Sequence, residues 1–385
     1  MKLRSFAIIA ASFILAACQS TAYNPAKPVK VLLDDSVFPS YIHFPVETEE
    51  QVFALSDEAK AFVDEAIKQE DDQRQQIKVL VAKIFDRSDL NLLYRGNANT
   101  VASDTFQNRS ANCLSMSIMT YALASYAGFD ASLQDIDIPE YWTRRDGFSL
   151  LNGHVNVRVV PKEYSNIIRL TTQQTIVDFD PQESRKHFAV RRIGKTKTLA
   201  MYYNNKGADA LIDGSYSKAY AYFRAAAKTA EDFDATWVNL GILYRRSGYH
   251  ELAMQSYHKA IEIDPENLTA WENIAFLHFQ AGDEQKGQTI MARVEKRRQN
   301  NPFYHFILGE QAFDAGNMEL ALGYYRSAFK LDNKRHEVLF GLSKTYYEMG
   351  DISRSVRFMK MAEKQAPNDQ DAERYQGKLS KLLNT

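Results

Sequence analysis

Residues 237–265 of this 385-residue chain, WVNLGILYRRSGYHELAMQSYHKAIEIDP, carry the clearest structural pattern of its C-terminal half. The large and small residues of this stretch follow a fixed order: Trp237, Leu240, Gly241, Tyr244, Ala253, Tyr257, Ala260 and Pro265. Small residues such as Gly241 and Ala253 suit places where two helices approach closely, and the large residues fill the space between successive helix pairs. The stretch therefore predicts a helix pair that stacks against similar pairs.

The same order recurs in steps of 34 residues along the chain. The next copy is degenerate and consists of Trp271, Ile274 and Ala275. The other copies are Leu308, Gly309, Ala321, Tyr325 and Ala328, then Leu342, Tyr346, Met359, Ala362 and Pro367, and, one step before the first, Gly207, Ala210, Ala219, Phe223 and Ala226. This order resembles the tetratricopeptide repeat (TPR). The resemblance implies an all-α solenoid of five repeats over residues 200–369, with a capping helix over residues 370–385.

A set of aromatic residues lies off the packing positions of the repeat. By the TPR resemblance, the groove-facing positions of each repeat carry Phe276, Phe279, Phe303, Phe306, Phe313, Phe340 and Tyr347. An aromatic stripe at helical spacing usually belongs to a core, but here other residues already occupy the core positions. We therefore expect the stripe to face either a bound protein or peptide or another part of this chain.

The N-terminus has the form of a targeting signal. Lys2 and Arg4 precede the apolar run Phe6 to Leu15, which is too short to span a bilayer as a stable anchor. The residues Leu15-Ala16-Ala17-Cys18 resemble the lipobox of bacterial lipoproteins. The resemblance implies removal of residues 1–17, lipidation of Cys18, a tether over residues 18–44, and a periplasm-facing anchor in the cell envelope, favouring the outer membrane. The alternative is an ordinary secretory signal with an incidental cysteine.

Residues 45–195 show no repeat and carry candidate chemistry. Helical stretches are expected around Ser56–Lys68 and Gln73–Asp86. Cys113 then opens an apolar helical run that ends at Gly128. Because the N-terminus of a helix favours negative charge, Cys113 is placed where a thiolate is stabilised.

Two predicted strands follow that helix. The segment from His154 to Val159 alternates with period two, and so does the segment from Thr175 to Pro181, which puts Asp178 and Asp180 on one face. A cysteine at a helix start, a histidine on one strand and a carboxylate on the next form a Cys-His-Asp arrangement.

This arrangement resembles the transglutaminase-like superfamily, which is papain-like in architecture, over roughly Leu90 to Pro181. The resemblance implies an α+β domain in which Cys113 is the nucleophile, His154 the general base and Asp180 the orienting carboxylate, with Asp178 as the alternative. It implies acyl-transfer chemistry on amides: protease, amidase or transamidase. Where the family often has Gly before the cysteine, Trp after it and an aromatic residue beyond the histidine, this chain has Ala111, Leu114 and Asn156. A non-catalytic domain on a TPR assembly scaffold therefore stands as the alternative.

Composition excludes several other classes of function. The chain has 47 Lys and Arg against 48 Asp and Glu, so no global positive field attracts nucleic acid. Two cysteines exclude a disulfide scaffold and a multi-thiolate zinc site. No HExxH, Walker or GxGxxG motif is present, so neither a metal nor a nucleotide cofactor is expected.

Overall fold

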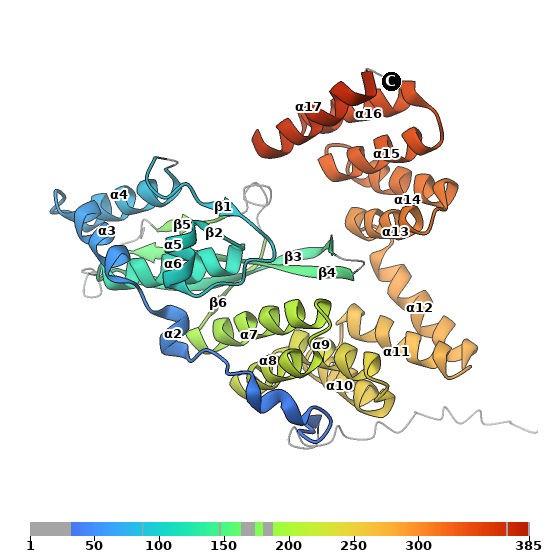
Figure 1. Ribbon diagram of the computed structural model, residues 1–385, viewed down its shortest axis with the longest axis horizontal. Coiled ribbons are helices and arrows are strands. Elements are labelled where there is room, and N and C mark those ends of the chain that lie inside the picture. The colour runs from blue at the N-terminus through green and yellow to red at the C-terminus, as the bar shows by residue number, and fades with distance from the viewer. Residues whose placement is uncertain are drawn as a thin grey trace, which may run out of the picture.

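The computed structural model describes residues 32–86, 88–145, 148–162, 174–179, 188–366 and 369–383. In these ranges a mixed helix-and-sheet domain comes first, and a curved array of paired helices follows it (Figure 1). No described helix combines the length and the apolar character that crossing a bilayer requires. The predicted signal peptide with Cys18, and also Asp180, lie outside the described residues.

Most helices of the first domain begin after a polar residue that caps them. Ser56, Asp72 and Asn112 each accept a hydrogen bond from the backbone N–H three residues later, which satisfies a donor that the helix itself leaves open. The two helical stretches expected early in this domain are confirmed. The helices are α2 (Glu49–Phe53), α3 (Asp57–Ile67), α4 (Gln73–Phe85), α5 (Ala102–Asn108) and α6 (Cys113–Tyr126).

Helix α6 packs against a four-stranded antiparallel sheet. The strand order is β5 (Thr175–Val177), β4 (Phe148–Val160), β3 (Asp130–Arg145) and β6 (Val190–Ile193). Ile118 and Leu123 of α6 belong to one buried apolar core with Val155 and Val157 of β4. A small parallel pair, β1 (Leu93–Tyr94) with β2 (Ser110–Ala111), lies just before α6. The sheet therefore presents β4, with His154, to the helix that carries Cys113.

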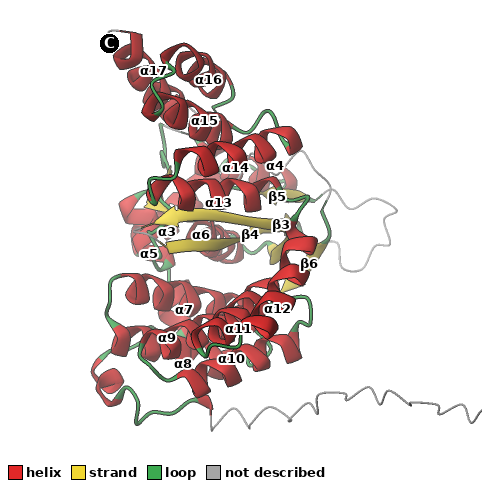
Figure 2. Cartoon of the chain, turned by 90° about the vertical axis from the view of Figure 1, so that its right-hand side faces the viewer, coloured by secondary structure: helices red, strands yellow, loops and turns green. Residues whose placement is uncertain are grey.

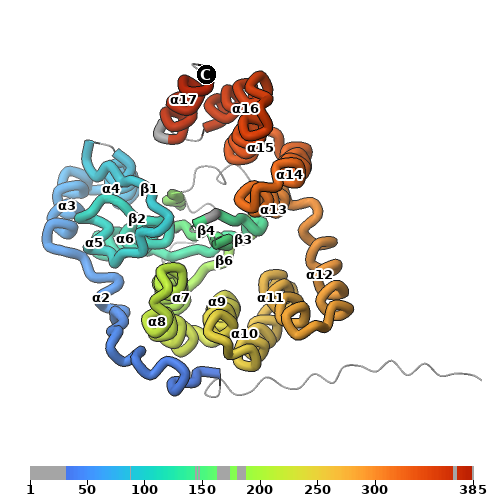
Figure 3. Tube along the Cα trace, turned by 45° about the vertical axis from the view of Figure 1, so that its right-hand side comes forward, coloured from blue at the N-terminus to red at the C-terminus, as the bar shows by residue number. Residues whose placement is uncertain are grey.

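The hairpin of β3 and β4 extends beyond the domain. Figure 3 shows it projecting into the inner side of the helical array, and Figure 2 shows its strands between α13 and the helices α7–α12. The register shifts between Ile136, which pairs with His154, and Tyr141, which pairs with Asn152. Such a bulge re-aims the side chains beside it, and Glu140 lies within this one.

The solenoid consists of consecutive helix pairs. Among the described residues these are α7 (Lys195–Ile212) with α8 (Tyr216–Thr229), α9 (Asp234–Arg246) with α10 (His250–Ile263), α11 (Leu268–Gln280) with α12 (Glu284–Arg298), α13 (Pro302–Asp314) with α14 (Met318–Leu331), and α15 (His336–Glu348) with α16 (Ile352–Lys364), followed by α17 (Asp369–Leu383). Each turn between paired helices contains a glycine with φ between +75° and +85°: Gly214, Gly248, Gly282, Gly316 and Gly350. These five glycines follow the 34-residue spacing of the repeat. Glycine occupies each turn because it adopts a positive φ without strain.

Residues 32–44 lie against the solenoid, although the sequence suggested that residues 18–44 form a tether. Leu32, Leu33 and Phe38 are buried in the core that runs from α7 to α12. The backbone oxygen of Leu32 accepts a hydrogen bond from Tyr244 at 2.7 Å, and Asp35 pairs with Arg224. Burial of these apolar side chains stabilises the packing of the segment, although several of its other residues are polar. The described part of the expected tether is therefore part of the fold.

The apolar interior of the solenoid is divided near α12. The buried residues of α7–α11 form one cluster, and those of α13–α15 and α15–α17 form two others. The helices α7 and α8 also contribute Tyr202, Tyr203 and Tyr222 to the core of the first domain. One end of the solenoid is thus fused to the cysteine domain, and the other end curves back over the β3–β4 hairpin (Figure 3).

Candidate active site

Cys113 is the first residue of α6 and is partly exposed. Asn112 caps the helix: its Oδ1 accepts from the backbone N–H of Ser115 at 2.9 Å. Ser117, one turn along, donates its hydroxyl to the backbone oxygen of Val155 at 3.1 Å. This bond ties the helix of Cys113 to the strand of His154.

His154 lies on β4 and is 3% exposed. Its Nε2 is 2.9 Å from Oδ2 of Asp178, which directly follows β5. Asn156 donates to the same oxygen at 3.3 Å. The carboxylate therefore binds one ring nitrogen and orients the imidazole. Asp178, which the sequence analysis gives as the alternative to Asp180, occupies this position within the described part of the chain.

Cys113 and His154 line one cavity of about 530 Å³. Phe179, next to Asp178, lines it as well. The opposite walls come from the β3–β4 hairpin and from the inner helices of the solenoid. These walls include Tyr141, Trp142, Arg145 and Phe148 of the hairpin, and Asn204, Asp209, Asp234, Asn239 and Asn267 of the solenoid. The cavity thus lies between the two halves of the molecule.

Polar side chains line the solenoid side of the cavity. Burial raises the pKa of Asp234, although this carboxylate accepts a hydrogen bond from Asn267 at 2.7 Å. Asn239 donates to Asn204 at 2.9 Å across the gap between α9 and α7. Amide side chains both donate and accept, so this wall offers groups that match the polar groups of a peptide. Within the described residues no cluster of three or more His, Cys, Asp or Glu side chains could hold a metal ion.

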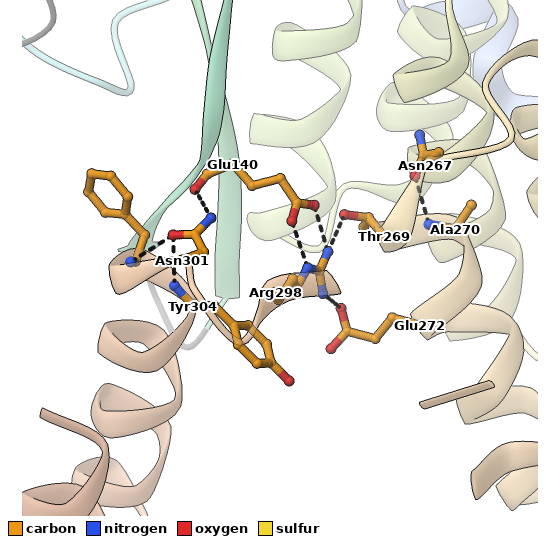
Figure 4. A network of polar contacts seen from close by, with 9 residues as sticks. Glu140, Asn267, Thr269, Ala270, Glu272, Arg298, Asn301 and Tyr304 are labelled. Atoms are coloured by element: carbon orange, nitrogen blue, oxygen red, sulfur yellow. Dashed lines mark hydrogen bonds and ion pairs between the residues drawn. The ribbon is translucent and has the colours of Figure 1, made fainter. Parts of the chain in front are cut away.

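An ion pair at the bulge, in which the arginine is buried, holds the hairpin in the solenoid (Figure 4). Arg298, at the end of α12 and 2% exposed, binds Glu140 through two hydrogen bonds of 2.7 Å. The same guanidinium binds Glu272 and Thr269 of α11, and Asn301 donates to the backbone oxygen of Glu140. Figure 4 shows Arg298 between the hairpin and α11. This junction fixes the hairpin wall of the cavity.

The aromatic stripe of the sequence analysis is divided between different environments. Phe303 is 6% exposed, and its ring lies 4.4 Å from that of Tyr141, so another part of this chain covers it. Phe306 and Phe313 pack on the α13–α15 core, Phe340 packs on the α15–α17 core, and Phe279 packs against Gly287. Phe276 and Tyr347 are 44% and 43% exposed. The seven residues therefore lie in different packing environments, and Phe276 and Tyr347 are the most exposed of them.

Sequence reasoning missed the hairpin wall and the polar residues that join it to Cys113. Asn99, Arg145 and Asp209 line the cavity but carry no motif. The only local signal was Asn112, a helix-capping residue type that stands directly before the cysteine.

Comparison with known proteins matches the C-terminal half. Residues 241–282 match a family model described as TPR repeat, and residues 312–382 match one described as Tetratricopeptide repeat. A TPR repeat-containing protein of Methanocaldococcus jannaschii is 24% identical over 159 residues, which cover 41% of this chain and 27% of that protein. The photosystem I assembly protein Ycf3 of Acaryochloris marina is 29% identical over 105 residues, which cover 26% of this chain and 63% of that protein.

Two solved structures are similar to parts of the chain. PilF of Pseudomonas aeruginosa has 13% identity and a TM-score of 0.30, with 50% of this chain and 87% of that chain covered. YrrB, described as a TPR protein with an unusual peptide-binding site, has 15% identity and a TM-score of 0.26, with 46% and 92% covered. The matches to the family models establish that this chain contains tetratricopeptide repeats, a class of repeat that binds proteins or peptides.

Proposed function

We propose that this protein is a cysteine-dependent acyl-transfer enzyme, transglutaminase-like in its first domain, that acts on an amide of a peptide held between that domain and the TPR solenoid. The observation that carries the proposal is the His154–Asp178 pair, whose imidazole lines the same cavity as Cys113 at the start of α6. A nucleophile, a base and a group that orients the base form the arrangement required for nucleophilic catalysis.

The proposed reaction follows from the orientation of the imidazole. Because Asp178 binds Nε2, the proton of Cys113 passes to Nδ1, which yields a thiolate and an imidazolium. The thiolate attacks the amide carbonyl carbon, and the C–N bond breaks as the imidazolium protonates the leaving amine. Water or a second amine then attacks the thioester and gives its proton to His154, the C–S bond breaks, and the released Cys113 thiolate takes that proton back from the imidazolium. The N-terminus of α6 stabilises negative charge on the sulfur.

Alkylation of Cys113 tests the proposal directly. In a Cys18→Ser background Cys113 is the only cysteine of the chain. At pH 6 an ordinary thiol is almost entirely protonated, so we expect iodoacetamide to modify Cys113 about tenfold faster than it modifies the His154→Ala variant. His43→Ala changes an exposed histidine outside the cavity and should leave the rate unchanged. Equal rates in all three proteins would instead support a non-catalytic TPR scaffold.

We further propose that the mature chain is anchored by lipid on Cys18 and faces the periplasm. The run Leu15-Ala16-Ala17-Cys18 supports this proposal. Cys18→Ser should move the protein from the membrane fraction to the soluble fraction and remove the lipid mass from its N-terminus. Cys113→Ser, the matched change at the other cysteine, should leave both properties intact. A soluble wild-type protein cleaved at another position would contradict the anchor.

A further inference from the structure

Residues 98–100 surround the first turn of the helix that carries Cys113. The backbone oxygen of Ala98 accepts from the N–H of Asn112 at 3.1 Å, and the N–H of Thr100 donates to Oγ of Ser115 at 3.0 Å. Between them, Oδ1 of Asn99 accepts from Nδ2 of Asn112 at 2.5 Å. The residue immediately before Cys113 is thus held by the backbone and side chains of this segment.

One carboxylate of the solenoid, that of Asp209, forms a hydrogen bond with this segment. Asp209, on α7, accepts a hydrogen bond from Nδ2 of Asn99 and another from Arg145 of the β3–β4 hairpin, each at 2.5 Å. Asn99 and Asn112 are only 9% and 6% exposed. Asp209, Arg145, Asn99, Asn112 and Cys113 all line the cavity. Asp209 is therefore a junction between the solenoid, the hairpin and the cysteine helix.

The chemistry of these groups gives the chain of hydrogen bonds a single direction. Asn112 must turn Oδ1 towards the N–H of Ser115 to cap α6, so its Nδ2 faces Asn99. Asn99 must then present Oδ1 to Asn112 and Nδ2 to its other neighbour. An ionised carboxylate can only accept, so Asp209 permits this order and opposes the flipped one. A neutral amide at position 209 would accept either orientation.

We propose that Asp209 is a positioning residue for Cys113: the solenoid carboxylate fixes the orientation of Asn99 and Asn112, and through them the start of α6. The inference rests on the proposed function only in treating Cys113 as the nucleophile. Its consequence is that the cysteine domain depends on the solenoid for the geometry of its own site. Loss of a buried hydrogen bond to a charged group changes an equilibrium by about tenfold or more.

Amide hydrogen exchange of the full-length protein tests the positioning without reference to catalysis. In Asp209→Ala we expect peptides that contain Asn99 and Asn112 to exchange about tenfold faster than in the wild type, with the helices α13–α16 unchanged. Asp213→Ala changes an exposed carboxylate at the end of the same helix and should have no such effect. If Asp209→Ala does not fold, the isosteric Asp209→Asn takes its place, with a smaller increase at the same peptides.

A double-mutant cycle shows whether Asp209 acts through Asn99. Because both residues belong to one chain of hydrogen bonds, adding Asn99→Ala to Asp209→Ala should cause little further change in exchange or in the Cys113 alkylation rate. Unchanged exchange in Asp209→Ala, or fully additive effects of the two changes, would overturn the proposal. An unreactive Cys113 in the wild type would contradict the catalytic function alone, because the exchange measurement still decides the role of Asp209.

Discussion

For single residues of the candidate site, the orientation of a side chain depends on partners that are distant in the sequence. Asn112 caps α6 by the ordinary preference of its residue type, but Asn99 and Asp209 determine which way its amide faces. His154 likewise acquires its orientation from Asp178, 24 residues further along the chain. Residue type sets what a group can do, and its neighbours in space determine whether it does so.

Single glycines in the repeats provide a sharp test of packing. A Cβ at Gly241 would lie 2.4 Å from the ring of Tyr257, which is completely buried, so the ring or the helix would have to shift. We expect Gly241→Ala to lower the free energy of unfolding by about 1–3 kcal/mol, measured by urea denaturation. Gly323→Ala, also inside a helix but facing open space, should raise it by about 0.5–1 kcal/mol. A similar effect of both changes would contradict the close approach.

At the scale of elements, the β3–β4 hairpin gives the solenoid its intramolecular partner. Trp142 of the hairpin forms a buried cluster with Phe303, Tyr304 and Ile307 of α13. The long strands reach the solenoid because the bulge between Ile136 and Tyr141 redirects the hairpin and carries Glu140. Part of the inner surface of the solenoid is therefore occupied by the same chain.

Two aromatic residues of the predicted stripe should respond differently to substitution. Phe303→Ser should reduce the free energy of unfolding by about 3 kcal/mol, because the ring is buried against the hairpin. Phe276→Ser should cost less than about 1 kcal/mol, because this ring is 44% exposed. The pair is matched, since an arginine lies over each ring: Arg335 over Phe303 and Arg245 over Phe276. Equal losses in denaturation experiments would show that the hairpin does not cover Phe303.

At the scale of the whole molecule, the cavity exists because the solenoid curves back on the cysteine domain. Its walls come from α6 and β4, from the hairpin and from inner helices of the array. The fused core at α7 and α8 holds one end, and the Arg298–Glu140 ion pair holds the hairpin near α12 and α13. Because the hairpin lines the cavity, breaking this ion pair should change the position of that cavity wall.

Neighbouring arginines at the end of α12 allow a controlled test of that junction. Glu140→Gln leaves the buried guanidinium of Arg298 with one carboxylate partner instead of two, and should cost about 3 kcal/mol in thermal or urea unfolding. Glu266→Gln weakens the exposed pair with Arg297 and should cost under about 1 kcal/mol. If the two variants unfold alike, the hairpin is not held by Arg298.

Features that depend on short-range periodicity could be predicted from the amino-acid sequence alone. The 34-residue order from Gly207 to Pro367 specifies the helix pairs, because each pair buries the same positions against its neighbours. The helix start at Cys113 and the alternation around His154 were also readable, since caps and strand periods are local properties.

Contacts between residues far apart in the sequence could not be predicted and became visible with the three-dimensional arrangement. The contact of His154 with Asp178 joins residues 24 positions apart, and the bond between Asn99 and Asp209 joins residues 110 positions apart. The hairpin residue Tyr141 covers Phe303 of α13 in the same way. The packing of residues 32–44 on the solenoid is of the same kind. Such contacts follow from how a bulged hairpin and a curved array of helices fit together, and no local pattern in the sequence encodes that fit.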